Sequence, residues 1–301
     1  IRDLIEFFER SGELVRVKRP VDKDKELAAV LKRVQTELKK AVLFESVKGT
    51  DFMVVGNLYG GRDKLARIFG VPEEEVVKEW VRSRESKPIK PVRVNSSPCQ
   101  EVVHERNINI GEILPIPYQY RGDAAPFINS AVVVVKDPKT KTYNASFNRM
   151  QLHGGNRLGI QLVINMDLFF IQKEAEKRGE PVEIAALISP DPYLFLAAAT
   201  RLPRELDEIE YAGALAGSPV ELIPCKTVDL EVPASAEIVL EGRIPPNTYV
   251  EEGPMGEVLQ YYGSTSTKPI FEVTAITHRK RPILEALLTG TIEDHVLCGV
   301  P

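Results

Sequence analysis

Cysteine and histidine are scarce in this sequence. Three cysteines, Cys99, Cys225 and Cys298, lie far apart, and no two of them form a Cys-x-x-Cys pair. The four histidines are scattered as well, so the chain lacks the clustered ligands of a zinc site. An odd number of isolated cysteines also argues against a disulfide framework. The cysteines are therefore predicted to be buried, reduced thiols of a cytoplasmic protein.

Long apolar runs and a basic excess are also absent from the sequence. No run of about 18 apolar residues is present that would span a bilayer, and the first four residues lack the basic and then apolar regions of a signal peptide. Lysine and arginine number 39 against 43 aspartates and glutamates, which argues against a nucleic-acid-binding protein. Frequent Glu and Lys with few Gln and Cys is typical of thermophiles.

The length and hydrophobic content are sufficient for about two domains. The chain has 301 residues, of which 43% are hydrophobic. Residues 1–95 predict an N-terminal α/β domain, with helices at 2–10, 24–37, 63–69 and 72–82 and strands at 14–17, 42–44 and 52–55. Prolines between 88 and 117 predict a linker, about residues 86–121, that wraps a second domain.

Residues 96–301 predict a second domain that is rich in β-strands. Segments 131–135 and 143–152 flank a polar turn, which indicates a β-hairpin. Further helices are expected at 167–178 and in two short stretches, and further strands at 182–188, 220–224, 227–232, 237–244, 271–278 and 282–288. Short strands with Gly and Pro turns favour a barrel or sandwich over a doubly wound sheet, so the predicted fold class is α+β. The apolar run 296–301 is a poor natural terminus and suggests that the sequence is a fragment.

The first segment with chemical potential is 144–151, Asn-Ala-Ser-Phe-Asn-Arg-Met-Gln. On a predicted strand Asn144, Ser146 and Asn148 face one way, because side chains alternate. Arg149 faces the other way if the strand is regular, so a bulge is needed for both sets to meet one ligand. The alternative is an ordinary solvated strand of a barrel.

The second segment is 251–257, Glu-Glu-Gly-Pro-Met-Gly-Glu. Two glycines and a proline predict a tight irregular loop, which Glu252 and Glu257 bracket. Paired carboxylates near Arg149 can hold different protonation states: one stays ionised against the arginine, and the other, more buried, holds a proton to donate. An acidic surface loop is the alternative.

The third segment, 207–217, begins with the acids Asp207, Glu208 and Glu210 and continues with small residues. This pattern predicts a helix that packs closely against a neighbour, and a surface helix is the alternative. The four histidines are each predicted to be structural, with His153 the strongest candidate for another role because it follows Arg149 by four positions.

Taken together, these segments resemble the UbiD family of reversible decarboxylases, which use prenylated FMN. Asn144, Arg149 and Gln151 match the family's Asn-x-x-x-x-Arg-x-Gln motif, and residues 252–257 match its Glu-Gly-Pro-x-Gly-Glu loop. Residues 229–242 match a third motif, Asp-Leu-x-Val-Pro-Ala-x-Ala-Glu-Ile-Val-Leu-Glu-Gly. The resemblance spans nearly the whole chain and implies a split β-barrel of the flavin-binding type over about 96–300. It also implies a C-terminal helical region, which this sequence lacks.

The resemblance implies catalytic roles for Arg149, Glu252 and Glu257. These three residues would form an ionic network. The prenylated flavin would act as an electron sink while CO₂ leaves, and Glu257 would then protonate the substrate carbon. Residues implied to bind the cofactor are Asn144, Ser146, Arg149, Gln151, Gln161 and Glu208.

The resemblance also implies a divalent cation that tethers the cofactor phosphate. Asn144 and Glu208 match two of its ligands, whereas Gln161 stands where the family usually has a histidine ligand. Asn144, Gln161 and Glu208 would then be an all-oxygen set, which suits Mn²⁺ or Mg²⁺. K⁺ is a further candidate ion.

The substrate implied by the resemblance is a small carboxylic acid, aromatic or α,β-unsaturated. An archaeal branch decarboxylates trans-anhydromevalonate phosphate in isoprenoid synthesis, and the thermophile-like composition and Gln161 favour that branch. His153 and Arg157 are candidates for contact with the substrate phosphate. Expected partners are a flavin prenyltransferase, which supplies the cofactor, and further copies of the chain in a homo-oligomer.

Three alternatives remain open at this point. The chain could act on hydroxybenzoate-type aromatic acids, or it could be an oxidoreductase that uses plain FMN on a split barrel. It could also be a non-catalytic subunit of a larger carboxylase, for which the missing histidine ligand is the best argument. The presence of Arg149, Glu252 and Glu257 together argues against that last alternative.

Overall fold

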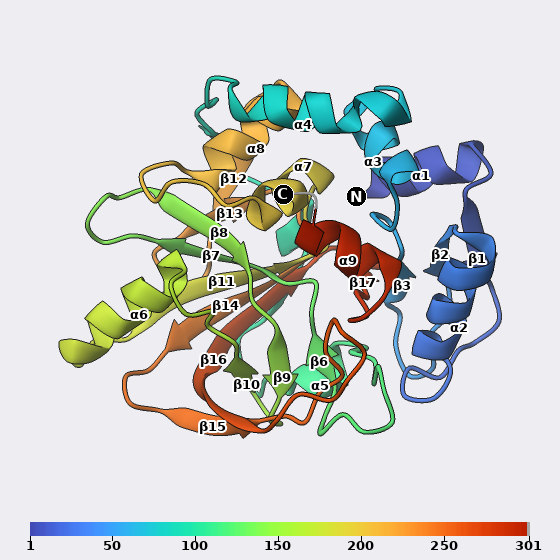
Figure 1. Ribbon diagram of the computed structural model, residues 1–301. Coiled ribbons are helices and arrows are strands. Elements are labelled where there is room, and N and C mark those ends of the chain that lie inside the picture. The colour runs from blue at the N-terminus through green and yellow to red at the C-terminus, as the bar shows by residue number, and fades with distance from the viewer. Residues whose placement is uncertain (300–301) are drawn as a thin grey trace.

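Residues 1–299, as described by a computed structural model, form a mixed α+β fold with three sheets (Figure 1). The sheets contain ten, four and three strands. Val300 and Pro301, the end of the apolar run 296–301, lie outside the described residues. Within residues 1–299, no helix is long and apolar enough to cross a membrane.

The four-stranded sheet is built mainly from the N-terminal part of the chain. Its strands, in spatial order, are β1 (Leu14–Val17), β2 (Ala41–Phe44), β3 (Met53–Gly56) and β17 (Ile283–Glu285). The helical segments of this part of the chain are α1 (Arg2–Arg10), α2 (Leu27–Arg33), η1 (Val34–Leu38), α3 (Arg62–Phe69), η2 (Glu73–Glu75) and α4 (Val76–Arg84). The sequence pattern wrongly grouped β17 with the barrel strands, because a short apolar run does not specify which sheet it joins; β17 pairs with β3 in parallel.

The ten-stranded sheet contains the predicted hairpin. Its strands are β5 (Val102–His104), β6 (Phe127–Ile128), β7 (Val132–Lys136), β8 (Tyr143–Phe147), β9 (Met150–Leu152), β10 (Arg157–Ile160), β11 (Val182–Ile188), β14 (Ile238–Ile244), β15 (Tyr249–Glu252) and β16 (Ser266–His278). The order is β6-β9-β10-β16-β14-β11-β7-β8, with β5 and β15 also paired to β16. The pairing of β7 with β8 confirms the hairpin expected from the sequence.

The connection between β8 and β9 shows that this sheet is curled. The two strands lie near opposite ends of the hydrogen-bonded order, yet only Asn148 and Arg149 join them. Three residue steps reach at most about 11 Å, so the two ends of the sheet must approach each other. The result is a half-barrel that is open along this crossing (Figure 1), in agreement with the α+β fold and curled sheet expected.

The two faces of the curled sheet pack into different cores. Along β7, Val132 and Val134 belong to one buried cluster and Val133 and Val135 to another. This alternation is the period of two expected for a strand buried on both faces. The four valines are at most 1% exposed, which explains why the sequence shows a continuous apolar run there.

A small third sheet and further helices surround the half-barrel. The sheet has the order β13 (Glu231–Pro233), β12 (Glu221–Pro224) and β4 (Val92–Arg93). The remaining helical segments are η3 (Pro98–Gln100), α5 (Ile110–Ile113), α6 (Asp167–Lys177), α7 (Pro192–Ala199), α8 (Glu208–Ala216) and α9 (Ile292–Gly299).

The predicted linker, 86–121, is partly wrong, because β4 and β5 within it pair with β12 and β16. Its prolines interrupt the periodic pattern that would have revealed these short strands. The predicted strand 227–232 is also displaced, since pairing begins only at Glu231. The domain boundary at residue 95 stays a prediction.

Candidate active site

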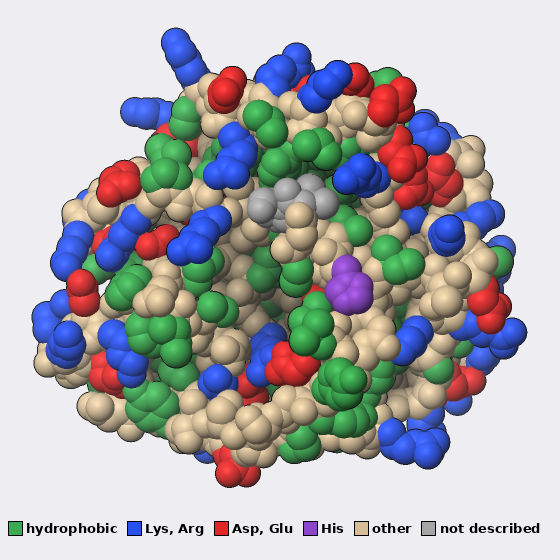
Figure 2. Space-filling model, in the orientation of Figure 1, with side chains coloured by type: hydrophobic (Ala, Val, Ile, Leu, Met, Phe, Trp, Pro, Cys, Tyr) green, Lys and Arg blue, Asp and Glu red, His purple; other side chains and the backbone are tan. Residues whose placement is uncertain are grey.

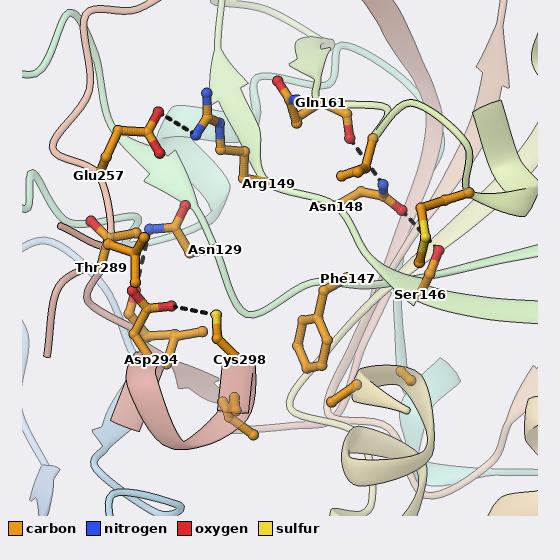
Figure 3. Close-up of a pocket in the computed structure, with 17 residues that line it drawn as sticks. Asn129, Ser146, Phe147, Asn148, Arg149, Gln161, Glu257, Thr289, Asp294 and Cys298 are labelled. Carbon is orange, nitrogen blue, oxygen red and sulfur yellow. Dashed lines mark hydrogen bonds and ion pairs between the residues drawn. The ribbon is translucent and has the colours of Figure 1, made fainter. Parts of the chain in front are cut away.

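A cavity of about 460 Å³ lies at the opening of the half-barrel. Its lining comes from several parts of the chain, among them the segment 146–149, the segment 161–166 after β10, the loop that carries Glu257, and the region 287–298 that contains α9. Figure 2 shows a hollow near the middle of one face of the molecule, and Figure 3 shows the cavity-lining side chains. The cavity is therefore bordered by residues that are distant in sequence.

Arg149 is the centre of a charged network on the cavity wall, and Figure 3 shows its contact with Glu257. Its Nη2 donates to Glu252 Oε2 at 3.0 Å and its Nε to Glu252 Oε1 at 3.4 Å. Its Nη1 donates to Glu257 Oε1 at 2.8 Å. Burial lowers the pKa of the Arg149 guanidinium, but the hydrogen bonds and charges of the two glutamates outweigh it, and the pKa is raised. The three residues singled out in the sequence are thus brought together.

The two glutamates differ in burial, in the opposite sense to that expected. The side chain of Glu252 is 1% exposed, whereas that of Glu257 is 37% exposed. The expectation that the proton-donating carboxyl is the more buried one is therefore wrong for Glu257. Both oxygens of Glu252 accept hydrogen bonds from Arg149. Glu257 lines the cavity, and its Oε2 accepts no hydrogen bond from any described residue.

The loop that carries Glu257 is held by local contacts. Gly253, with φ +96°, donates its N–H to Gln151 Oε1 at 2.7 Å. The N–H of Glu257 donates to Tyr261 O at 2.8 Å, which closes a tight turn. A Cβ at Gly263 would lie 2.6 Å from Glu257 Oε1, so a larger residue there would displace this carboxylate. Gln151 is 6% exposed and does not line the cavity. Its contact with Gly253 helps to hold the loop, and its predicted contact with the cofactor stays a prediction.

The crossing of the chain from β8 to β9 explains how Asn148 and Arg149 can point toward the same cavity. A regular strand would direct Asn148 and Arg149 to opposite faces. Because strand pairing is interrupted at these two residues, Ser146, Asn148 and Arg149 all line the cavity. Asn148 is fixed by its Nδ2, which donates to Gln161 O at 2.9 Å, and Ser146 Oγ donates to Asn148 Oδ1 at 3.1 Å. The sequence predicted a bulge at this point. The structure instead has a break in strand pairing, after which the chain joins different neighbouring strands.

The residues expected to bind a cation lie in and beside a second, smaller cavity of about 210 Å³. Asn144 and Glu208 line it, with Asn144 Nδ2 at 3.4 Å from Glu208 Oε2. Gln161 lines the larger cavity, and Ser146 lines both. No contact between Gln161 and either of the other two residues is present among the described side chains.

The chemistry of these residues fits a hard divalent cation. Gln161 Oε1 is buried without a hydrogen-bond partner among the described residues, and Glu208 is 4% exposed. Burial raises the pKa of Glu208 to about 8, although Ala145 N–H donates to its Oε2 at 3.0 Å. A cation would supply the missing partner for Gln161 Oε1 and a counter-charge for the buried Glu208 carboxylate. Residues 1–299 contain no group of three or more His, Cys, Asp or Glu that could hold a metal, so a cation bound here would need amide oxygens among its ligands.

The helix α8 that presents Glu208 begins as the sequence predicts. Asp207 caps it, with its Oδ1 accepting from the N–H groups of Ile209 and Glu210 at 2.8 and 3.2 Å. A Cβ at Gly213 would lie 3.1 Å from Ile89 O, which confirms the expected close packing of the small residues. Glu208 is thereby fixed beside β8.

Several cavity residues were not identified from the sequence. Asn129, Thr289, Asp294 and Cys298 line the same cavity as Arg149 (Figure 3). Asn129 lies between β6 and β7, and the other three lie just before or within α9. No sequence motif marks these positions, so only the tertiary fold reveals them. The prediction of uniformly buried thiols is wrong for Cys298, which is exposed, while Cys99 is buried and Cys225 half-buried.

His153 and Arg157 do not line the cavity. They flank the turn between β9 and β10, where His153 N–H donates to Arg157 O at 3.0 Å. Arg157 is exposed, and burial lowers the pKa of His153. The expected contact of these two residues with a substrate phosphate in the cavity is therefore not supported by their position.

Fold and site together combine a half-barrel with a charged network of Arg149, Glu252 and Glu257 on the wall of a cavity. Residues 90–292 match the family described as the UbiD 3-octaprenyl-4-hydroxybenzoate carboxy-lyase Rift-related domain. Residues 5–84 match the N-terminal domain of the same carboxy-lyase. The chain belongs to the UbiD family of carboxy-lyases.

Similar proteins span the whole chain but are longer than it. An anhydromevalonate phosphate decarboxylase of Methanosarcina mazei is 35% identical over 301 residues, which are 100% of this chain and 68% of the relative. An uncharacterised protein of Synechocystis is 33% identical, and the match covers 96% of this chain and 62% of that protein. An evolved dimeric form of the UbiD-class enzyme HmfF from Pelotomaculum thermopropionicum, in complex with prFMN, superposes with a TM-score of 0.94 at 38% identity. That superposition covers 99% of this chain and 70% of HmfF.

Proposed function

We propose that this chain is the catalytic part of a decarboxylase that uses prenylated FMN on an α,β-unsaturated or aromatic carboxylic acid. The observation that carries the proposal is Arg149, held between Glu252 and Glu257 on the wall of a cavity. Family membership supports the reaction class, and HmfF structures in complex with prFMN and with FMN support the cofactor.

The chain's own residues account for the proton transfer. When bound, the cofactor supplies an electron sink for the electrons left behind by CO₂. Arg149 holds Oε1 of Glu257, which leaves Oε2 to carry a proton toward the cavity. Glu252 keeps the guanidinium in place through its two contacts. Ser146, Asn148 and Gln161 line the cavity and would bind the cofactor there, and Ser146 also lines the smaller cavity beside it.

Asn144, Gln161 and Glu208 would hold Mn²⁺ or Mg²⁺ and, through it, the cofactor phosphate. We predict that Glu208→Ala abolishes the thermal stabilisation that Mn²⁺ and FMN together give to the wild type, because the only charged ligand is lost. Thermal unfolding with and without both ligands measures this effect. Glu210→Ala on the same helix is the matched control and should behave like the wild type. Equal stabilisation of the Glu208→Ala variant would contradict this assignment.

The substrate we favour is trans-anhydromevalonate phosphate, on the strength of the Methanosarcina relative. The expected product is isopentenyl phosphate, detected by mass spectrometry after the substrate is added to holoenzyme. Hydroxybenzoate-type acids serve as the comparison, since family members in solved structures include a vanillic acid decarboxylase of Sedimentibacter hydroxybenzoicus. Release of CO₂ from the aromatic acids alone would assign the chain to the aromatic alternative.

The plain-FMN oxidoreductase and the non-catalytic subunit are less well supported. A spectrum and mass of the bound flavin separate plain from prenylated FMN. The complete Arg149 network is the argument against a non-catalytic subunit. Six further expectations remain proposals that extend this function. They are cytoplasmic location, a homo-oligomer, supply of the cofactor by a flavin prenyltransferase, K⁺ binding, a thermophilic source and a role in isoprenoid synthesis.

A further inference from the structure

The backbone on both sides of Glu257 is held from the region of α9. Thr289 Oγ1 donates to Gly256 O at 2.6 Å, on one side of Glu257. His295 Nε2 donates to Val258 O at 3.0 Å, on the other side. The peptide groups that flank the proposed proton donor are therefore clasped by one residue just before α9 and one within it. Any shift of α9 would move Glu257.

The helix α9 is in turn fixed to the N-terminal part of the chain through Glu293. This side chain is 2% exposed. Its Oε2 accepts the backbone N–H of Asn57 and its Oε1 that of Tyr59, both at 2.9 Å. The two N–H groups lie in the connection between β3 and α3, so they come from more than 230 positions earlier in the chain.

The connection that receives Glu293 is itself rigidly held. Asn57 Nδ2 donates to Lys40 O at 2.6 Å, and Gln35 Nε2 donates to Asn57 Oδ1 at 2.9 Å. A Cβ at Gly60 would lie 1.9 Å from Asn57 Oδ1, so the Asn57 side chain packs directly against the backbone of Gly60. Glu293 thus docks onto a preformed pair of donors.

We propose that Glu293 is a positioning residue for Glu257: it anchors α9 to the N-terminal part of the chain, and α9 sets the place of the proton donor. The inference rests on the proposed function in so far as Glu257 is the acid. No other role is evident for a buried carboxylate that does not line the cavity. The N-terminal part of the chain thereby contributes to the active site without touching it.

The anchor needs a carboxylate, because each of its oxygens receives a different N–H. An amide of the same shape would present an NH₂ group to one of these donors and lose that hydrogen bond. Burial raises the pKa of Glu293 to about 7, while the N–H groups and the charge of Lys64 lower it. The test is best made at pH 8, where the carboxylate predominates.

A second buried carboxylate provides a matched control. Glu285 on β17 is 1% exposed, and neither of its oxygens has a hydrogen-bond partner among the described residues. Its pKa is raised well above the ordinary value, first by burial and then by the charge of Glu293. Glu285→Gln changes a neighbouring buried carboxyl without removing any contact of the anchor.

The experiment compares Glu293→Gln with Glu285→Gln by hydrogen exchange and by kinetics. In Glu293→Gln, amides of residues 256–263 should exchange at least about tenfold faster, which corresponds to about 1.4 kcal/mol of lost local protection. With holoenzyme, kcat should fall by a similar factor while KM and cofactor binding stay unchanged. Glu285→Gln should leave both readouts at wild-type values.

Unchanged exchange and unchanged kcat in a folded Glu293→Gln variant would overturn the proposal. If that variant does not fold, Thr289→Val with His295→Ala removes the clasp while leaving the buried anchor intact. The double variant must then show the faster exchange and lower kcat, and wild-type values would again overturn the proposal. Hydrogen exchange needs no substrate, so it decides the anchoring role even if the wild type shows no decarboxylation, which would sink only the proposed function.

Discussion

Glu257→Gln is expected to remove most turnover while leaving cofactor binding intact. The amide can still accept the hydrogen bond from Arg149 Nη1, so the geometry of the network is kept. It cannot deliver a proton to the substrate carbon. Loss of a general acid typically costs about 10²–10⁴-fold in rate, and CO₂ release by holoenzyme at saturating substrate measures it.

The matched control for this variant is Glu251→Gln. Glu251 is exposed and belongs to the same acidic segment, so its substitution tests whether loss of charge alone slows the reaction. Wild-type turnover is expected for the control. CO₂ release at a near-normal rate by Glu257→Gln would show that another group delivers the proton.

Arg149→Met is expected to destabilise the protein as well as inactivate it. The substitution leaves Glu252, at 1% exposure, without a partner in the buried part of the network. Removing one member of a buried ion pair costs about 3–5 kcal/mol, and the lower end applies here because Arg149 is 23% exposed. With an entropy of unfolding of about 2.1 cal/mol/K per residue, about 3 kcal/mol corresponds to a fall in Tm of roughly 5 °C for this chain. Thermal unfolding of cofactor-free protein measures it.

A double variant separates the uncompensated charge from general loss of packing. Arg149→Met with Glu252→Leu removes both charges, so at least half of the lost stability should return. Activity should not return with it, because the guanidinium that orients Glu257 is still absent. A single variant that unfolds within about 2 °C of the wild type would show that Glu252 finds another partner.

The charged network of Arg149, Glu252 and Glu257 was predictable from the sequence because its members lie in two short motifs. Arg149 is embedded in one and Glu252 and Glu257 bracket the other, so local spacing carried the information. Which glutamate is buried was not predictable. That difference depends on the room left by Gly263 and on how the loop packs against distant residues.

The walls of the cavity were less predictable for a physical reason. Asn129, Asp294 and Cys298 reach the site only because the half-barrel curls and α9 packs over its opening. Neither event leaves a periodic signal in the sequence. The same holds for β17, whose three residues read as one more barrel strand but complete the N-terminal sheet.

The most direct test of the decarboxylase assignment is native mass spectrometry of the chain after co-expression with a flavin prenyltransferase in medium containing Mn²⁺. The account predicts one prenylated FMN and one divalent cation for each chain, with the cation lost in Glu208→Ala. Plain FMN alone under these conditions, or no bound flavin, would contradict it.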